Sequence, residues 1–176
     1  PEYTLIEYAY YKMALDAGIL MSDCRIYSNA GENHFMTKRF DRIHGKKVHM
    51  QSLGAMAHIS YKEPRLCSYE MAAGYMREIY LPMKDIEQFY SRMVFNCVAV
   101  NQDDHVKNIS FLMNRSGEWR LSPAYDVTYS YDVTNKWLSA HQMTINGKKS
   151  NINLTDLLAA GENMGLKKKK YNGLIN

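Results

Sequence analysis

The feature that most constrains this chain is a buried helix that runs into a polar loop and then a β-hairpin. Apolar residues recur at helical spacing over 86–100, which predicts a largely buried helix that ends at Asn101. The polar loop 101–108 follows, and 109–121 reads as two short strands joined by a turn. This pattern predicts a mixed α+β domain in which a helix and a hairpin hold a polar loop between them.

Two acids and an amide flank this hairpin. Asp103 and Asn108 lie in the loop before it, and Asp126 lies in the loop after it. Because a hairpin returns the chain on itself, we expect these side chains to converge and to offer the oxygen ligands that Mg²⁺ prefers. Asp and Asn are also ordinary turn residues, and an isolated D-x-x-x-x-N is a weak signal. The second acidic loop favours a nucleotide site, since a kinase needs one acid as base and an amide and an acid on Mg²⁺.

Both loops resemble those of the HipA-type serine/threonine kinases, the toxin halves of bacterial toxin–antitoxin pairs, and their relatives. Asp103–Asn108 (DDHVKN) is similar to the family pattern D-[GD]-H-x-K-N, and Leu121–Asp126 (LSPAYD) to L-[ST]-P-x-Y-D. Phe35–Arg42 resembles the family's hinge, and His141–Gly147 and Glu162–Gly165 resemble its C-terminal region. The motifs occur in the family's order, and the resemblance covers roughly residues 1–166, nearly the whole chain.

The resemblance implies roles for five residues in the chemistry. Asp103 would be the catalytic base, and His105 and Lys107 would act beside the phosphates. Asn108 and Asp126 would ligate Mg²⁺. The implied reaction is transfer of the γ-phosphate of ATP to a protein hydroxyl.

The resemblance also implies a nucleotide-binding set. Lys38 and Phe40 would present backbone groups to adenine, and Asp41 would lie near the ribose. His105 and Tyr125 belong to the same set, beside the phosphates and the metal.

The implied fold is the C-lobe of a protein kinase, mostly helical with short β-hairpins. We expect 1–41 to be a remnant of the N-lobe with the hinge, 42–166 to be the helical C-lobe, and 167–176 to be a basic tail. A helix is predicted over 1–18, with Glu7 or Glu2 as the partner of a strand lysine. Neither that lysine nor a phosphate-covering loop is found in the sequence, so we expect a fragment whose own activity stays open.

The remaining elements follow from local signals. Two strands are expected over 24–38, a short strand over 48–50, and a short helix over 52–58 with Ser52 as its N-cap. Helices are also expected over 68–79, from Pro82 onwards, and over 155–164.

Composition narrows the class of protein. The net charge is +4, from 22 basic and 18 acidic residues, and Lys167–Lys170 supplies the whole excess. A solvated run explains that excess better than contact with nucleic acid. The three cysteines form no C-x-x-C motif, which suits reduced thiols in the cytoplasm, and no apolar run is long enough to span a membrane. The histidines lack zinc-site spacing.

Two other functions fit parts of the pattern. A Mg²⁺-dependent phosphohydrolase would use similar ligands, although it usually needs more carboxylates than Asp103, Asp104 and Asp126 supply. A degenerate kinase acting as a nucleotide-binding module of a transcription-repressing complex would keep ATP without transferring phosphate. The family also implies a protein substrate, with aminoacyl-tRNA synthetases as the class that its members phosphorylate. Its implied partner is a HipB-like helix-turn-helix antitoxin, through which alone it would reach DNA.

Overall fold

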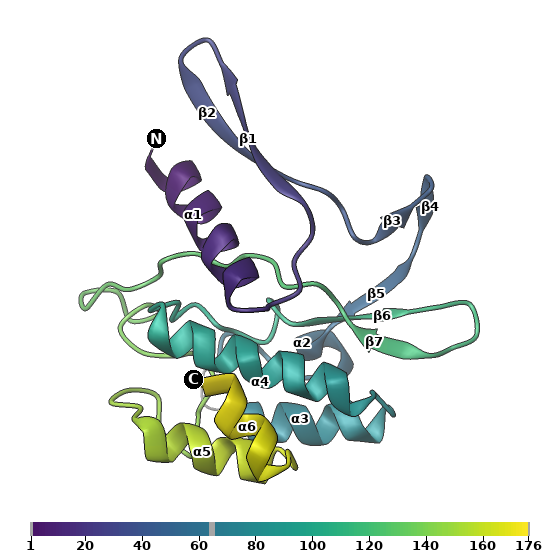
Figure 1. Ribbon diagram of the computed structural model, residues 1–176, viewed down its shortest axis with the longest axis vertical. Helices are drawn as coiled ribbons and strands as arrows, with labels where there is room; N and C mark the ends of the chain where they lie inside the picture. Colours follow the sequence, from purple (N-terminus) through teal and green to yellow (C-terminus); the bar gives the residue numbers. More distant parts are fainter. Residues whose placement is uncertain (1, 64–65, 176) are drawn as a thin grey trace.

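The structure is a computed structural model that describes residues 2–63 and 66–175. Its helices are α1 (Glu2–Asp16), α2 (Leu53–Met56), α3 (Tyr69–Glu78), α4 (Met83–Val98), α5 (Leu154–Asn163) and α6 (Lys168–Ile175). Its strands are β1 (Cys24–Asn29), β2 (Glu32–Thr37), β3 (Arg42–Ile43), β4 (Lys46–Lys47), β5 (His49–Ser52), β6 (Ser110–Met113) and β7 (Trp119–Leu121). They pair antiparallel as β1–β2, β3–β4 and β5–β6–β7 (Figure 1). The predicted α+β class is confirmed.

Helices α3, α4, α5 and α6 form the helical base, which holds the larger core (Figure 1). Its fully buried side chains include Tyr69, Phe89, Tyr90, Met93, Phe111 and Met143. Full burial of one such apolar side chain stabilises the fold by about 1.5–3 kcal/mol. The base is therefore a rigid support for the loops that leave it.

Local capping explains where the base helices begin. The Ser68 hydroxyl accepts a hydrogen bond from the Met71 amide at 3.0 Å at the start of α3. At the start of α5, Asn153 and Asp156 cap each other's backbone amides reciprocally. Ser52 caps α2 as predicted, by accepting from the Ala55 amide.

Helix α4 ends earlier than the sequence indicated. It was expected to run through Val100, but it ends at Val98, whose side chain is 75% exposed. Val100 adopts a left-handed φ of 56°, and Asn101 then pairs with Ser130 as an isolated parallel bridge. The long-range pairing, which apolar spacing cannot reveal, ends the helix.

Residues 2–48 form the N-terminal arm, which comprises α1 and the β1–β2 and β3–β4 hairpins (Figure 1). Helix α1 contacts both strands of β1–β2. It joins the base through the Tyr10 hydroxyl, which donates to the Ala99 carbonyl. Gln88 of α4 adds two bonds to the turn after α1, donating to the Gly18 carbonyl and accepting from the Leu20 amide.

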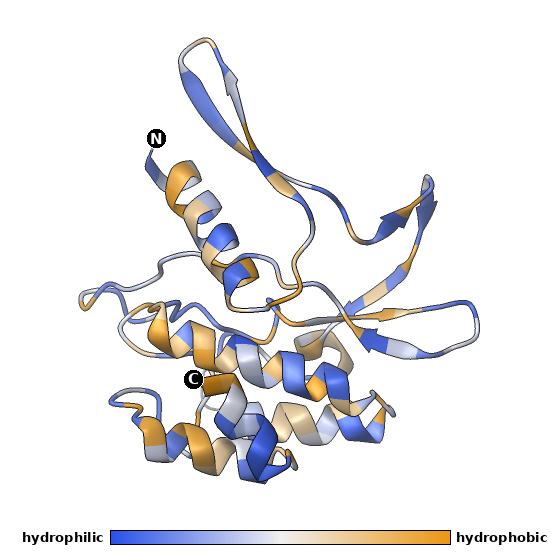
Figure 2. Ribbon diagram, viewed as in Figure 1, coloured by the Kyte–Doolittle hydropathy of each residue, from blue (hydrophilic) through white to orange (hydrophobic). Residues whose placement is uncertain are grey.

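The segment expected to be a basic tail carries helix α6. Its four lysines, Lys167–Lys170, are exposed, whereas Tyr171 is buried in the core. Figure 2 shows the hydrophilic start of this helix and its more apolar end. Within the described parts of the chain, every helix is too short or too polar to cross a membrane.

Candidate active site

Two loops meet at the end of the β6–β7 hairpin. The first, 99–109, connects α4 to β6, and the second, 122–127, follows β7. The predicted hairpin forms, and it pairs Phe111 with Leu121 and Met113 with Trp119. One cavity is lined by side chains from both loops, including Asp103, Asn108 and Asp126. The three side chains singled out from the sequence therefore lie around one space.

The hairpin is fixed to the helical base by two buried charged residues of α4. Asp85 accepts two hydrogen bonds from the Arg120 guanidinium, both at 2.7 Å, and one from the Leu121 amide at 3.0 Å. Arg92 donates to the Ser122 carbonyl at 2.6 Å. These bonds set the direction in which the chain leaves β7 towards Asp126.

Asp103 has the exposure and the electrostatic surroundings of a functional acid. Its side chain is 39% exposed at the edge of the cavity. Burial raises the pKa of its carboxyl, His105 opposes that shift, and the charges of Asp126 and Asp104 add to it. A carboxylate with a raised pKa is a better proton acceptor, and it is still ionised at neutral pH when the shift is moderate.

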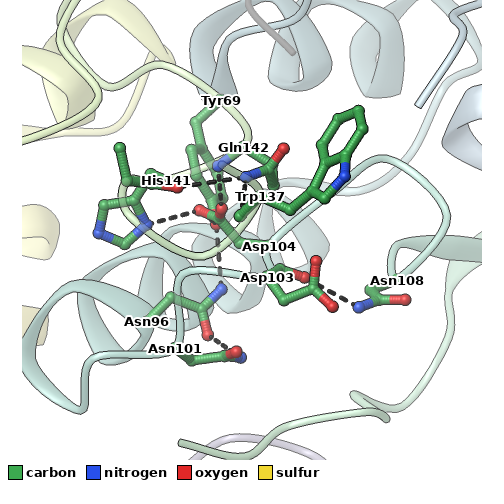
Figure 3. Close-up of polar contacts among 10 residues, drawn as sticks. Tyr69, Asn96, Asn101, Asp103, Asp104, Asn108, Trp137, His141 and Gln142 are labelled. Carbon is green, nitrogen blue, oxygen red and sulfur yellow. Dashed lines mark hydrogen bonds and ion pairs between the residues drawn. The ribbon is translucent and has the colours of Figure 1, made fainter. Parts of the chain in front are cut away.

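Asn108 and Asp126 offer oxygens suited to a hard cation. Asn108 donates its amide N–H to the Asp103 carbonyl at 3.0 Å, and its amide oxygen points the other way (Figure 3). Asp126 has a left-handed φ of 56° and is exposed. Within residues 2–63 and 66–175, no three His, Cys, Asp or Glu side chains could hold a metal together. The donor set fits Mg²⁺ held by one or two protein oxygens, waters and phosphates.

Glu7 of α1 lies close enough to Asp126 for their charges to interact. Burial, and then the charge of Asp126, raise the pKa of the Glu7 carboxyl. Glu7, one of the two acids considered for the start of the chain, thus interacts electrostatically with the Asp126 loop. A cation between Glu7 and Asp126 would relieve their repulsion.

His105 and Lys107 both contact Tyr61. The Lys107 ammonium lies 3.4 Å from the centroid of the Tyr61 ring, and the His105 ring packs edge-on against the same tyrosine. His105 Nε2 is 3.8 Å from Asp103 Oδ1. A cation over an aromatic face is attracted by the ring quadrupole. The structure therefore places His105 beside the predicted base, and it places the Lys107 charge on Tyr61.

The three hinge residues lie on the segment that leaves β2. The Lys38 amide donates to the Asp23 carbonyl at 2.9 Å. Asp41 is bound by Arg39 and Arg42, and the hydrogen bonds from Arg39 lower the pKa of its carboxyl. The Asp41 carboxylate is thus engaged by arginines in this conformation, while the Lys38 carbonyl oxygen stays a candidate group for adenine.

Tyr125 connects the hinge to both loops. Its ring lies 5.6 Å from that of Phe40, centroid to centroid. Its hydroxyl donates to the Lys107 carbonyl at 2.6 Å and lies 2.6 Å from the Ser110 hydroxyl. The ring of Tyr125 can face a nucleotide while its hydroxyl ties the Asp126 loop to the Asn108 loop.

The sequence did not predict a buried hydrogen-bond network next to Asp103, the proposed catalytic base. Asp104, whose side chain is 1% exposed, accepts from the Tyr69 hydroxyl, from His141 Nδ1 and from the Gln142 amide (Figure 3). Asn96 in turn donates to the Tyr69 hydroxyl at 3.0 Å. The available sequence signal was the acidic pair Asp103-Asp104 and, much later, the family-like pair His141-Gln142. This signal does not reveal that the two pairs are in contact.

Comparison with known proteins places this arrangement in a family. The family model described as HipA-like C-terminal domain matches residues 1–176. A search of curated protein sequences found no match. The HipA of Shewanella oneidensis, solved with HipB and operator DNA, superposes with a TM-score of 0.82 at 19% identity, over 98% of this chain and 46% of that one. The proinflammatory kinase CtkA of Helicobacter pylori superposes with a TM-score of 0.66 at 14% identity, over 99% of this chain and 75% of that one.

These matches confirm the resemblance and the kinase-like fold that it implied. The chain spans about half the length of the Shewanella protein. Since the family model covers every residue of the chain, the chain belongs to the HipA-like C-terminal domain family.

Proposed function

We propose that this chain is the C-terminal part of a serine/threonine protein kinase that transfers the γ-phosphate of ATP to a protein hydroxyl. The observation that carries the proposal is that Asp103, Asn108 and Asp126 line one cavity at the end of the β6–β7 hairpin. It supplies the acid, the amide and the second acid that phosphoryl transfer requires. Membership of the HipA-like family and the fold shared with CtkA support the same activity.

The proposed chemistry is positioning and charge neutralisation. Asp103 accepts the proton of the acceptor hydroxyl and orients that oxygen towards the phosphate. Its raised pKa, caused first by burial, favours proton transfer near neutral pH. His105 Nε2 lies 3.8 Å from Asp103 Oδ1, from where a small movement would bring it onto that carboxylate or onto a phosphate.

Asn108 and Asp126 would hold Mg²⁺, which when bound neutralises charge on the phosphate oxygens. Tyr125 keeps these two ligands together through its bond to the Lys107 carbonyl. Lys38, Phe40 and the Tyr125 ring form the proposed adenine side of the site, with Asp41 near the ribose once its arginine pairs open. Lys107 would leave the Tyr61 ring to reach a phosphate.

The proposed setting is a toxin–antitoxin pair in the cytoplasm. The Shewanella HipA was solved with HipB and operator DNA, which supports a helix-turn-helix antitoxin as the partner of this protein and DNA contact through that partner. A protein acceptor, with aminoacyl-tRNA synthetases as the first class to examine, follows from the same family.

The test is transfer of labelled phosphate from ATP by the full-length protein in a cell extract, beside its Asp103→Ala and Asp126→Ala forms. Loss of the base should lower transfer by about 10²–10⁴-fold and leave MgATP binding nearly intact. Asp126→Ala should weaken MgATP binding itself, because it removes a ligand of the cation. Wild-type transfer by Asp103→Ala would contradict the assignment of the base.

The same experiment separates the two other candidate functions. A labelled protein band establishes a kinase, whereas release of free phosphate without a labelled band identifies a phosphohydrolase. MgATP binding with neither product identifies a nucleotide-binding module.

A further inference from the structure

Asp104 lies next to Asp103, the proposed catalytic base, and lines the same cavity, but its side chain is buried. The Asp103 side chain is 39% exposed at the cavity, whereas that of Asp104 is 1% exposed among groups from distant segments. It receives Tyr69 Oη at 2.8 Å and His141 Nδ1 at 2.9 Å on one oxygen, and the Gln142 amide at 2.7 Å on the other (Figure 3). A buried carboxylate is retained only where such donors compensate its lost hydration.

The donors on Asp104 come from two sides. Tyr69 begins α3 of the helical base, while His141 and Gln142 end the long segment that follows the Asp126 loop. Gln142 extends the contact backwards, because its side-chain amide donates to the carbonyls of Trp137 and Ala140. Asp104 therefore holds the far end of that segment against the loop that carries Asp103.

The near end of the segment is held by the same loop. The Gln102 amide donates to the Ser130 carbonyl at 3.0 Å, and the Ser130 amide donates to the Val100 carbonyl at 3.1 Å. Ser130 and Gln142 thus anchor the two ends of the segment on either side of Asp103.

Between its anchors the segment forms a loop of its own. The hydrogen bonds that the structure describes for 131–140 stay within 131–142, such as the Asp132 amide to the Leu138 carbonyl at 3.2 Å. Its surface includes Tyr131, which is 41% exposed, and Val133, which is 69% exposed. The loop is therefore held at both ends by residues that flank Asp103, and it leaves apolar side chains exposed between those ends.

We propose that Asp104 is a positioning residue that fixes segment 131–142 as one wall of the site where the acceptor protein meets Asp103. The inference rests on the proposed kinase function. With its side chain buried, Asp104 acts through Gln142 and His141, and it keeps the acceptor wall and Asp103 in one frame. Nucleotide binding by Asn108, Asp126 and the hinge does not depend on it.

The test compares Asp104→Asn with the wild type in the full-length protein, using MgATP and self-labelling or labelling of extract protein. The introduced amide cannot accept all three hydrogen bonds that the Asp104 carboxylate accepts, so segment 131–142 is held less tightly. We expect phosphate transfer to fall about 10- to 100-fold. MgATP affinity should stay within about twofold, since no nucleotide contact is lost, and hydrogen exchange of the 131–142 backbone should rise about tenfold.

The matched control is Tyr69→Phe. It also removes one hydrogen bond from Asp104, but it leaves the Gln142 and His141 bonds and the carboxylate in place. Thermal stability should fall, while transfer and exchange in 131–142 stay near those of the wild type. If Asp104→Asn does not fold, His141→Ala replaces it, because that change cuts one of the two bonds to the segment and should show the same effects more weakly.

Three results would overturn the proposal: wild-type transfer by Asp104→Asn, an equal loss of MgATP binding, or an equal loss of transfer in Tyr69→Phe. Failure of the wild type to transfer phosphate would instead remove the kinase function. The exchange comparison would then still decide whether Asp104 anchors the segment.

Discussion

The helical base and the N-terminal arm meet the same cavity with very different packing. Nine residues of α4, from Asp85 to Phe95, are buried, whereas α1 buries only Tyr11 and Ala14. The arm exposes apolar side chains, including Tyr3, Leu5 and Met13. The proposed catalytic base and metal ligands thus lie on loops that leave a packed core, while the proposed hinge lies on a lightly held arm. A site divided in this way would keep its chemistry rigid and let its nucleotide side adapt.

The largest expected effect comes from removing a buried side chain from the core of the helical base. Phe89 is 1% exposed and packs against Tyr69, with ring centroids 5.2 Å apart. Phe89→Ala should lower the free energy of unfolding by about 3–5 kcal/mol, since it removes buried area and leaves a cavity. Urea denaturation followed by circular dichroism measures this loss.

The matched change in the arm is Phe35→Ala. Phe35 is half-buried on β2 opposite Ile26, so its loss should cost less than about 1 kcal/mol globally. Equal costs for the two phenylalanines would show that the arm and the base unfold as one unit, which would contradict the division drawn here.

A smaller effect should follow from removing the Asp85 contacts that hold the β6–β7 hairpin to the helical base. Asp85→Asn leaves the Arg120 guanidinium and the Leu121 amide without their carboxylate. We expect a loss of about 2 kcal/mol, below the cost of breaking a fully buried pair, because Arg120 is about half exposed. Denaturation gives the stability, and increased hydrogen exchange in β7 shows where it is lost. Unchanged exchange there would place the role of Asp85 elsewhere.

The link between the two regions can be weakened at one hydroxyl, while the Gln88 hydrogen bonds and the apolar contacts remain. Tyr10→Phe removes the hydrogen bond to the Ala99 carbonyl but keeps the edge-on contact with Phe95. The expected loss is about 1 kcal/mol or less. Faster amide exchange confined to α1 would be the signature, and Tyr8→Phe serves as a control within the same helix.

The smallest effect is confined to acid. Hydrogen bonds from Lys148 and Asn146 hold the pKa of Asp156 at about 2. Because the folded pKa lies below the unfolded one, its stabilisation is complete above roughly pH 4 and is lost as the pH falls towards 2. Acid titration of the wild type beside Asp156→Asn measures it, and parallel curves through that window would refute the assignment.

Much of the site was readable from local sequence. The helix, the polar loop and the hairpin follow from apolar spacing and turn residues, and they bring Asp103, Asn108 and Asp126 to one cavity as expected. Their assigned roles stay predictions. The family was readable as well, because its motifs are contiguous and carry their own spacing.

Other features depended on contacts between distant segments. The Asn101–Ser130 pairing ends α4 early. Tyr171 is buried in the larger core, so α6 packs on the base where a solvated basic tail was expected. The Lys107 charge, expected beside phosphates, lies on the Tyr61 ring. None of these partners lies within the window that helical or strand periodicity covers.

Asp103 and Asp104 show most clearly what the sequence determined and what the tertiary structure decided. The sequence determined that two acids stand side by side in a loop after a buried helix. Their chemistry and local surroundings are the same, and only the family pattern singled out Asp103 as the candidate base. Only the tertiary structure decided that one faces the cavity and the other is buried among Tyr69, His141 and Gln142. The physical reason is that the stability of a buried carboxylate depends on donors that the fold brings from far along the chain.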